Sequence, residues 1–169
     1  FGRYYPNALS FTEVRGEMLY EMTKQYLPIE WRDQGLRLNK ALITIEEKIL
    51  KNASDSALNL KFYFETGVLN MSLLLNEKMK VEKETAINAL QKSHDALNKL
   101  KNFENIEEIK TCLIQVVTDL GYKNGQVFWP IRVDITTEQL TPGVFEVIWT
   151  LGKEESLKRL EKALQEIAV

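Results

Sequence analysis

The sequence predicts an all-α fold made of two small packed helical bundles. Apolar residues recur at helical spacing along most of the 169 residues, whereas the alternation typical of strands is nearly absent. Residues that cap or end helices stand between these stretches. Hydrophobic residues make up 44% of the chain and charged residues 27%, which is the balance of a globular protein and argues against disorder.

A capping box formed by Ser10 and Glu13 marks the start of the first expected helix. Pro28 ends this helix, because proline cannot continue one. Between them lies a single apolar stripe, which consists of Val14, Met18, Leu19, Met22 and Tyr26.

Two more helices are expected before the middle of the chain. The first carries apolar residues at helical spacing over residues 38–49. The second starts at Ser54, which is a suitable N-cap, and ends at Gly67. Residues 68–79 are apolar but poorly periodic, so irregular structure or a short helix is expected there.

This loss of periodicity predicts two domains, an N-terminal one of residues 1–66 and a C-terminal one of residues 67–169. The second domain begins with a helix that has a near-heptad seam. A further helix runs from the cap residue Asn105 to Gly121. The seam residues of the first of these helices are Ala86, Leu90, Ser93, Leu97 and Leu100.

Two helices are expected near the C-terminus. Thr141 as N-cap and Pro142 as first helical residue start one of them, and Gly152 ends it. The other is amphipathic and covers residues 157–167. Residues 133–136 are the only strand candidate in the sequence.

The composition argues against several classes of function. The single cysteine, Cys112, leaves no internal disulfide or Cys-based zinc site, and the single histidine, His94, leaves no multi-His metal centre. No apolar run approaches the ~20 residues that a membrane helix needs, so no membrane role is expected. The net charge of −2 argues against tight non-specific binding to long nucleic acids. No nucleophile with a base and no phosphate-binding glycine loop is found, so we expect a binding or scaffolding role.

Residues 123–144 stand out from this background. Two cations there flank an aromatic pair, in the order Lys123, Phe128, Trp129 and Arg132. Cations beside aromatic rings suit RNA, because unpaired bases stack on rings and phosphates attract positive charge. The helix start that follows offers free backbone N–H groups for an anionic or carbonyl-bearing ligand. Two plainer interpretations stay open, namely that the aromatic pair belongs to the core and that the arginine pairs with Asp134.

Three segments follow one another in this part: GQVFWPIRV at 125–133, LTPGVFE at 140–146 and LGKEESLKRL at 151–160. In order and spacing they resemble the C-terminal anticodon-binding region of bacterial-type glutamyl-tRNA synthetases. A looser similarity to the same family extends upstream and covers most of the chain. The chain begins at Phe1 rather than at methionine, so we expect it to be a fragment of a longer protein.

The resemblance implies an anticodon-binding superdomain that recognises the anticodon stem-loop of tRNA(Glu). The catalytic domain, with its ATP and Mg²⁺, would lie upstream in the same polypeptide. No catalytic residue, cofactor or metal site is therefore expected in this chain. The complete protein would be a monomeric, cytoplasmic ligase that attaches glutamate to tRNA, and charging of tRNA(Gln) is left open.

By the same resemblance, Arg132 reads the first anticodon base, helped by the main chain near Val144. Thr141 and Pro142 contact the middle base, and Lys123 lies near the phosphate backbone. An arginine fork suits a base edge, and peptide groups at a helix start suit a splayed base.

Three positions depart from the family's usual residues. Thr137 replaces a common glycine, and its Cβ disfavours a positive φ. Asp134 is acidic where a small residue is common, so it could bind Arg132 or weaken phosphate binding. Lys48 stands near the third-base reader, which is usually an arginine, and lacks the bidentate fork. The alternative function is a helical protein–protein adaptor that docks a partner helix through its aromatic pair.

Overall fold

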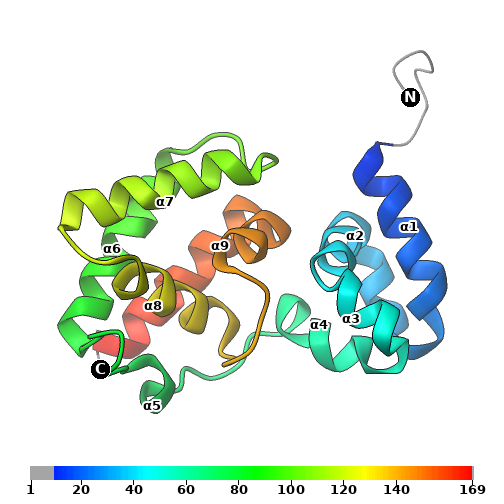
Figure 1. Cartoon of the computed structure of the whole chain (residues 1–169), viewed down its shortest axis with the longest axis horizontal. Helices are drawn as coiled ribbons and strands as arrows, with labels where there is room; N and C mark the ends of the chain where they lie inside the picture. Colours follow the sequence, from blue (N-terminus) through cyan, green and yellow to red (C-terminus); the bar gives the residue numbers. More distant parts are fainter. Residues whose placement is uncertain (1–9, 169) are drawn as a thin grey trace. The chain divides into compact units, whose positions relative to one another are not determined.

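The structure is a computed structural model that describes residues 10–168, and the chain divides into two compact units, residues 1–64 and 65–169. Over the described residues it consists of helices and connections (Figure 1). One isolated bridge joins Asn76 and Val81 within these residues. The predicted all-α class is confirmed. The division falls two residues before the predicted boundary, and the first nine residues of the predicted N-terminal domain lie outside the described residues. No helix within residues 10–168 is long and apolar enough to cross a membrane.

The first unit contains four α-helices and three short 3₁₀ segments over its described residues. The capping box is confirmed, because the Ser10 hydroxyl accepts from the Glu13 N–H at 3.2 Å and the Glu13 carboxylate accepts from the Ser10 N–H at 2.8 Å. The elements are α1 (Phe11–Thr23), η1 (Lys24–Tyr26), η2 (Ile29–Gln34), α2 (Gly35–Thr44), α3 (Glu46–Lys51), η3 (Ala53–Asp55) and α4 (Ser56–Phe64).

Helix α1 packs on α2 through a different face from the one that its sequence predicts. Leu19 is buried as expected, but Met18 and Met22 are exposed. The reason is Gly16, where an added Cβ would stand 2.4 Å from the Asn39 Cβ. Close approach of the two helices at this glycine turns the rest of the predicted stripe outward.

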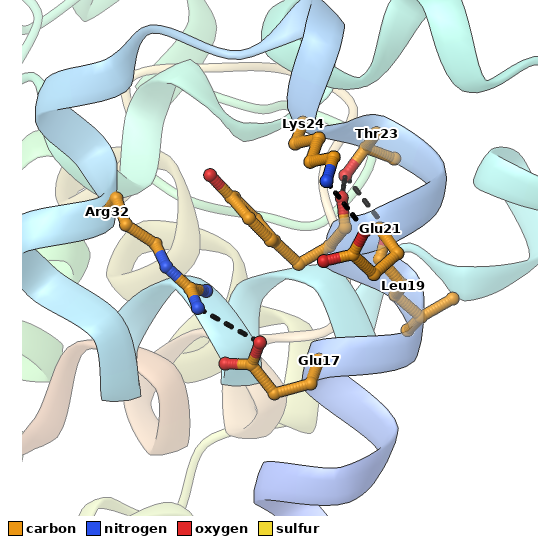
Figure 2. Close-up of polar contacts among 7 residues, drawn as sticks. Glu17, Leu19, Glu21, Thr23, Lys24 and Arg32 are labelled. Carbon is orange, nitrogen blue, oxygen red and sulfur yellow. Dashed lines mark hydrogen bonds and ion pairs between the residues drawn. The ribbon is translucent and has the colours of Figure 1, made fainter.

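Polar contacts tie α1 to the segment that follows it (Figure 2). Arg32 from η2 donates to the Glu17 carboxylate at 2.9 Å, and Lys24 pairs with Glu21 at 2.7 Å. The Thr23 hydroxyl donates to the Leu19 carbonyl at 2.9 Å, which satisfies a polar group inside the unit. Water screens exposed ion pairs such as these, so packing dominates the stability of this unit.

The second and third helices of this unit differ from the prediction in detail. The stripe of residues 38–49 is buried, but Ile45 leaves the helical conformation and splits it into α2 and α3. The N-cap of the next turn is Asn52 rather than Ser54, because the Asn52 carboxamide accepts from the Ser54 N–H at 3.2 Å. Asn52 also accepts from the Ser54 hydroxyl, which removes Ser54 from the capping role.

The second unit is built around α6, which packs against α7, α8 and α9 (Figure 1). Its predicted seam is confirmed, since the first four seam residues are fully buried and only Leu100 is partly exposed. The elements are α5 (Met71–Leu74), α6 (Lys83–Lys99), α7 (Ile106–Leu120), α8 (Asn124–Thr136) and α9 (Val144–Ala168). The strand candidate at 133–136 is wrong, because those residues form the last turn of α8 and bury their side chains in the helical core.

Gly152 interrupts α9 as the sequence predicts. Its φ of 79° and ψ of 176° lie in a region that is essentially reserved for glycine, and the residues on either side are helical. The break divides α9 into two helical segments, and the helix as a whole packs against α6, α7 and α8.

We expect Gly152→Ala to lower the free energy of unfolding by about 1–3 kcal/mol, because alanine must adopt a conformation that its Cβ opposes. Chemical denaturation followed by circular dichroism measures the change. Gly35→Ala is the matched control, since Gly35 has a helical φ of −52° and open space around it. An equal effect of the two substitutions would contradict the assigned role of Gly152.

Candidate nucleic-acid interface

One face of α8 and the start of α9 enclose an open pocket of about 380 Å³ in the second unit. Four α8 residues at positions i, i+3, i+4 and i+7 share this face, as expected for an α-helix. The pocket walls are mainly apolar and aromatic, with one cation. The lining residues are Met79, Gly125, Phe128, Trp129, Arg132, Gly143, Val144 and Phe145.

Arg132 is the cation of the pocket, and its guanidinium is held from two sides. Its Nη1 donates to the Thr141 hydroxyl at 2.8 Å, and its Cζ lies 5.2 Å from the centre of the Trp129 ring. Burial lowers the pKa of Arg132, yet guanidinium is basic enough to stay charged at neutral pH. The other donors of the fork have no hydrogen-bond partner within residues 10–168 and can bind a ligand that enters the pocket.

The aromatic pair forms walls of the pocket and is neither fully buried nor fully exposed. The Trp129 Nε1 donates to the carbonyls of Leu73 and Leu74 at 3.1 and 3.2 Å, which fixes the indole. Phe128 meets Phe145 edge to face, with ring centres 5.1 Å apart and an interplanar angle of 77°. The interpretation of this pair as core is therefore only partly right, because both rings also line the opening.

The helix start after the pocket begins later than predicted. Helix α9 starts at Val144, so Thr141 and Pro142 belong to the preceding loop. Thr141 does not act as N-cap, because its hydroxyl accepts from Arg132 and donates to the Pro142 carbonyl at 2.8 Å. The first N–H groups of a helix have no partner within it. Those of α9 lie at the pocket, because the buried Val144 at its start is one of the lining residues.

Lys123 does not line the pocket, and Lys48 belongs to the other unit. Lys123 is exposed at the N-cap of α8, nine residues before Arg132 and hence about 14 Å from it along the helix axis. Lys48 is exposed on α3 in the first unit. The structure thus brings together Arg132, Thr141 and Val144 in the second unit.

Thr137 adopts the conformation for which glycine is better suited. Its φ of 57° and ψ of 20° are left-handed, and its N–H donates to the Val133 carbonyl at 2.7 Å to end α8. A β-branched residue takes this conformation at a cost of roughly 1–2 kcal/mol. The loop after Arg132 therefore follows a glycine-like path in spite of the threonine.

Asp134 does not bind Arg132. Its carboxylate is buried on another side of α8, and neither oxygen has a hydrogen-bond partner among residues 10–168. Burial and, second, the charge of Glu166 raise the pKa of Asp134 to about 8. The interpretation that the arginine pairs with this carboxylate is therefore wrong.

Sequence reasoning missed Met79 and Phe145 as pocket residues. Met79 comes from the connection between α5 and α6, more than 40 residues before Arg132, and no periodicity signals such a contact. The available signal for Met79 was the looser family similarity of its segment. Phe145 lies within the LTPGVFE segment, whose family resemblance points to the neighbouring Val144 and not to Phe145.

Comparisons with known proteins identify a family. Residues 18–164 match the family model described as an anticodon binding domain. The glutamate–tRNA ligase of Clostridium kluyveri is 31% identical over 127 residues, which are 75% of this chain and 25% of that protein. The enzyme of the same name from Clostridium tetani is 34% identical over 107 residues, or 63% of this chain and 22% of that protein. The chain thus spans about a quarter of the length of these relatives.

Solved structures share the fold at low sequence identity. A glutamate–tRNA ligase from Elizabethkingia meningosepticum, in complex with its amino acid, matches with a TM-score of 0.68 and 19% identity. The match covers 94% of this chain and 30% of that one. The glutamate–tRNA synthetase of Elizabethkingia anophelis matches with a TM-score of 0.64 and 20% identity, over 93% of this chain and 29% of that one.

We expect Asp134→Asn to stabilise the protein more at pH 8 than at pH 5. In the unfolded protein the Asp134 carboxyl ionises near its ordinary pKa of 3.8, whereas its pKa in the folded protein is about 8. Between these values only the folded state binds the proton, so this residue lowers stability progressively as pH rises from about 4 to 8. The expected difference between the two pH values is at least about 1 kcal/mol in denaturant titrations.

Glu154→Gln is the control for that measurement, because Glu154 is an exposed carboxylate of the same unit. It should leave the pH dependence of unfolding unchanged. An Asp134→Asn protein with the pH dependence of the unaltered chain would show that the Asp134 carboxyl ionises normally in the fold.

Proposed function

This chain belongs to the anticodon-binding domain family, and we propose from that premise that it binds the anticodon stem-loop of tRNA(Glu). It would do so as the C-terminal part of a glutamate–tRNA ligase, the name that its relatives carry. The observation that carries the proposal is the pocket in which a half-buried arginine fork lies among aromatic walls beside a helix start.

We assign Arg132 to the first anticodon base. A guanidinium presents several donors in one plane, which suits the acceptors on a base edge. Its bond to Thr141 and its position over Trp129 limit its rotamers, so less side-chain freedom is lost on binding. Partial burial also strengthens each hydrogen bond that it makes, because water competes less.

The neighbouring residues complete the assignment. Peptide groups near Val144 would bind the same base, and Thr141 and Pro142 would contact the middle base. Lys123 would contact a phosphate and position the loop, whereas base contacts specify it. Lys48 would lie near the third base, where a lysine supplies charge but no bidentate readout.

The whole protein extends this proposal. ATP and Mg²⁺ would bind in an upstream catalytic domain, which would attach glutamate to the tRNA bound here. A translation enzyme of this kind would act as a monomer in the cytoplasm. This chain would then supply recognition and no catalytic group.

The protein adaptor is the weaker alternative, and the test below also decides it. Docking of a partner helix needs an apolar surface that is free to be covered. Phe128 and Trp129 instead form the walls of a concave pocket with a cation inside it, and Trp129 is fixed by two carbonyls. A pocket of this kind fits a flat ring better than a helix.

We expect Arg132→Ala to weaken binding of a tRNA(Glu) anticodon hairpin by about 1–3 kcal/mol in a titration at fixed salt. Arg132→Lys should recover charge but not discrimination at the first anticodon base, because lysine lacks the fork. Hairpins that differ only in that base measure the discrimination. Lys110→Ala is the control, since Lys110 is an exposed cation on α7 that does not line the pocket.

Unchanged binding by Arg132→Ala would remove the role assigned to this residue. A chain that binds no anticodon hairpin at low salt, but recovers a defined protein partner, would favour the adaptor instead. Circular dichroism of each variant checks that the helical fold is retained.

A further inference from the structure

The turn between α5 and α6 closes one side of the pocket. Met79 at its tip lines the pocket, and an added Cβ at Gly125 would stand 3.3 Å from the Met79 sulfur. Asn76 and Val81 close the turn with two reciprocal backbone bonds of 3.0 and 2.8 Å. The Asn76 carboxamide also accepts from the Met79 N–H at 3.0 Å, so a hydrogen bond within the turn holds the backbone of Met79 in place.

A single glutamine fastens this turn to the start of α8. The Gln126 carboxamide donates to the Lys80 carbonyl at 3.2 Å and accepts from the Lys123 N–H at 2.9 Å. The backbones of two lysines that are 43 positions apart in the sequence are thereby joined through one side chain. Lys80 has a φ of 60°, a left-handed conformation that a non-glycine residue adopts only where the surroundings enforce it.

The charges on this side of the pocket are exposed. Lys80 and Lys123 are both open to solvent, and neither takes part in an ion pair recorded among residues 10–168. The acidic neighbours are Glu77 in the turn and Glu82 after it, both exposed. One nucleotide can use both features, because its base packs on an apolar surface and its phosphate pairs with positive charge. Here an apolar wall lies next to two lysines whose backbones are joined through Gln126.

We propose that this turn is a part of the RNA-binding surface that positions the anticodon loop. Met79 contacts the base that enters the pocket, since a thioether is polarizable and packs well against a ring. Lys80 and Lys123 together bind a phosphate that flanks this base. The inference rests on the proposed function and adds to it two residues, Met79 and Lys80, that lie outside the family's three linked segments.

The test measures binding of the tRNA(Glu) anticodon hairpin to the full chain over a range of salt concentrations. Met79→Ala should weaken binding roughly three- to ten-fold at every salt concentration, because it removes apolar contact but no charge. Met79→Leu should restore most of the affinity. Lys80→Ala should lower the slope of log affinity against log salt by about 0.7, and Lys80→Arg should restore that slope.

The matched controls are Ile114→Ala and Lys110→Ala, an exposed apolar residue and an exposed cation on α7. Both should bind as the unaltered chain does. A merely structural role of the turn would change the thermal midpoint of the variants and leave the salt slope unchanged, and that result would overturn the inference.

The outcomes separate this inference from its premise. If Arg132→Ala loses affinity while the Met79 and Lys80 variants keep it, the turn is not part of the surface and the proposed function stands. If the unaltered chain binds no hairpin, the proposed function fails and the inference fails with it. Loss of affinity in all three variants, with the predicted change of slope for Lys80→Ala and no change of slope for Met79→Ala, supports both.

Discussion

The burial of α8 is the constraint on which the rest of the second unit depends. Val127, Ile131 and Ile135 are almost completely removed from solvent, and the helix packs against both α6 and α9. These buried residues fix the rotation of α8 about its axis. The residues at 125, 128, 129 and 132 must therefore lie on a different face of the helix, which lines the pocket. The side of the pocket that α8 forms is thus a consequence of core packing.

The same helix holds Arg132 and Asp134 on different sides. Arg132 is half-buried at the pocket, and Asp134 is buried without a hydrogen-bond partner in the described part of the chain. With its pKa raised to about 8, the Asp134 carboxyl is mostly protonated at neutral pH. An acidic residue two positions from the proposed base reader is therefore compatible with RNA binding, because its proton removes most of its charge.

Local sequence signals predicted the helices well and their contacts less well. The capping box at Ser10, the seam of α6 and the breaks at Gly121 and Gly152 depend on near neighbours along the chain, and all are confirmed. Most of the predicted α1 stripe faces outward because Gly16 approaches Asn39 of α2 closely. A contact between two helices produces no periodic pattern in the sequence of either helix. The helical state of residues 133–136 was missed because they alternate between apolar and polar, and four alternating residues are too few to distinguish a strand from a buried helical turn.

The sequence by itself determined the all-α class, the order of most helices and the segments that identify the anticodon-binding family. Only the tertiary structure decided which side chains share the pocket. It placed Met79 beside pocket residues that follow it by at least 46 positions in the sequence, and it separated Arg132 from Asp134. It also showed that the Thr141 hydroxyl binds Arg132 and does not cap the helix. The physical reason is that helix formation is governed by residues within a few positions of one another, whereas a pocket is governed by how the buried faces of several helices fit together.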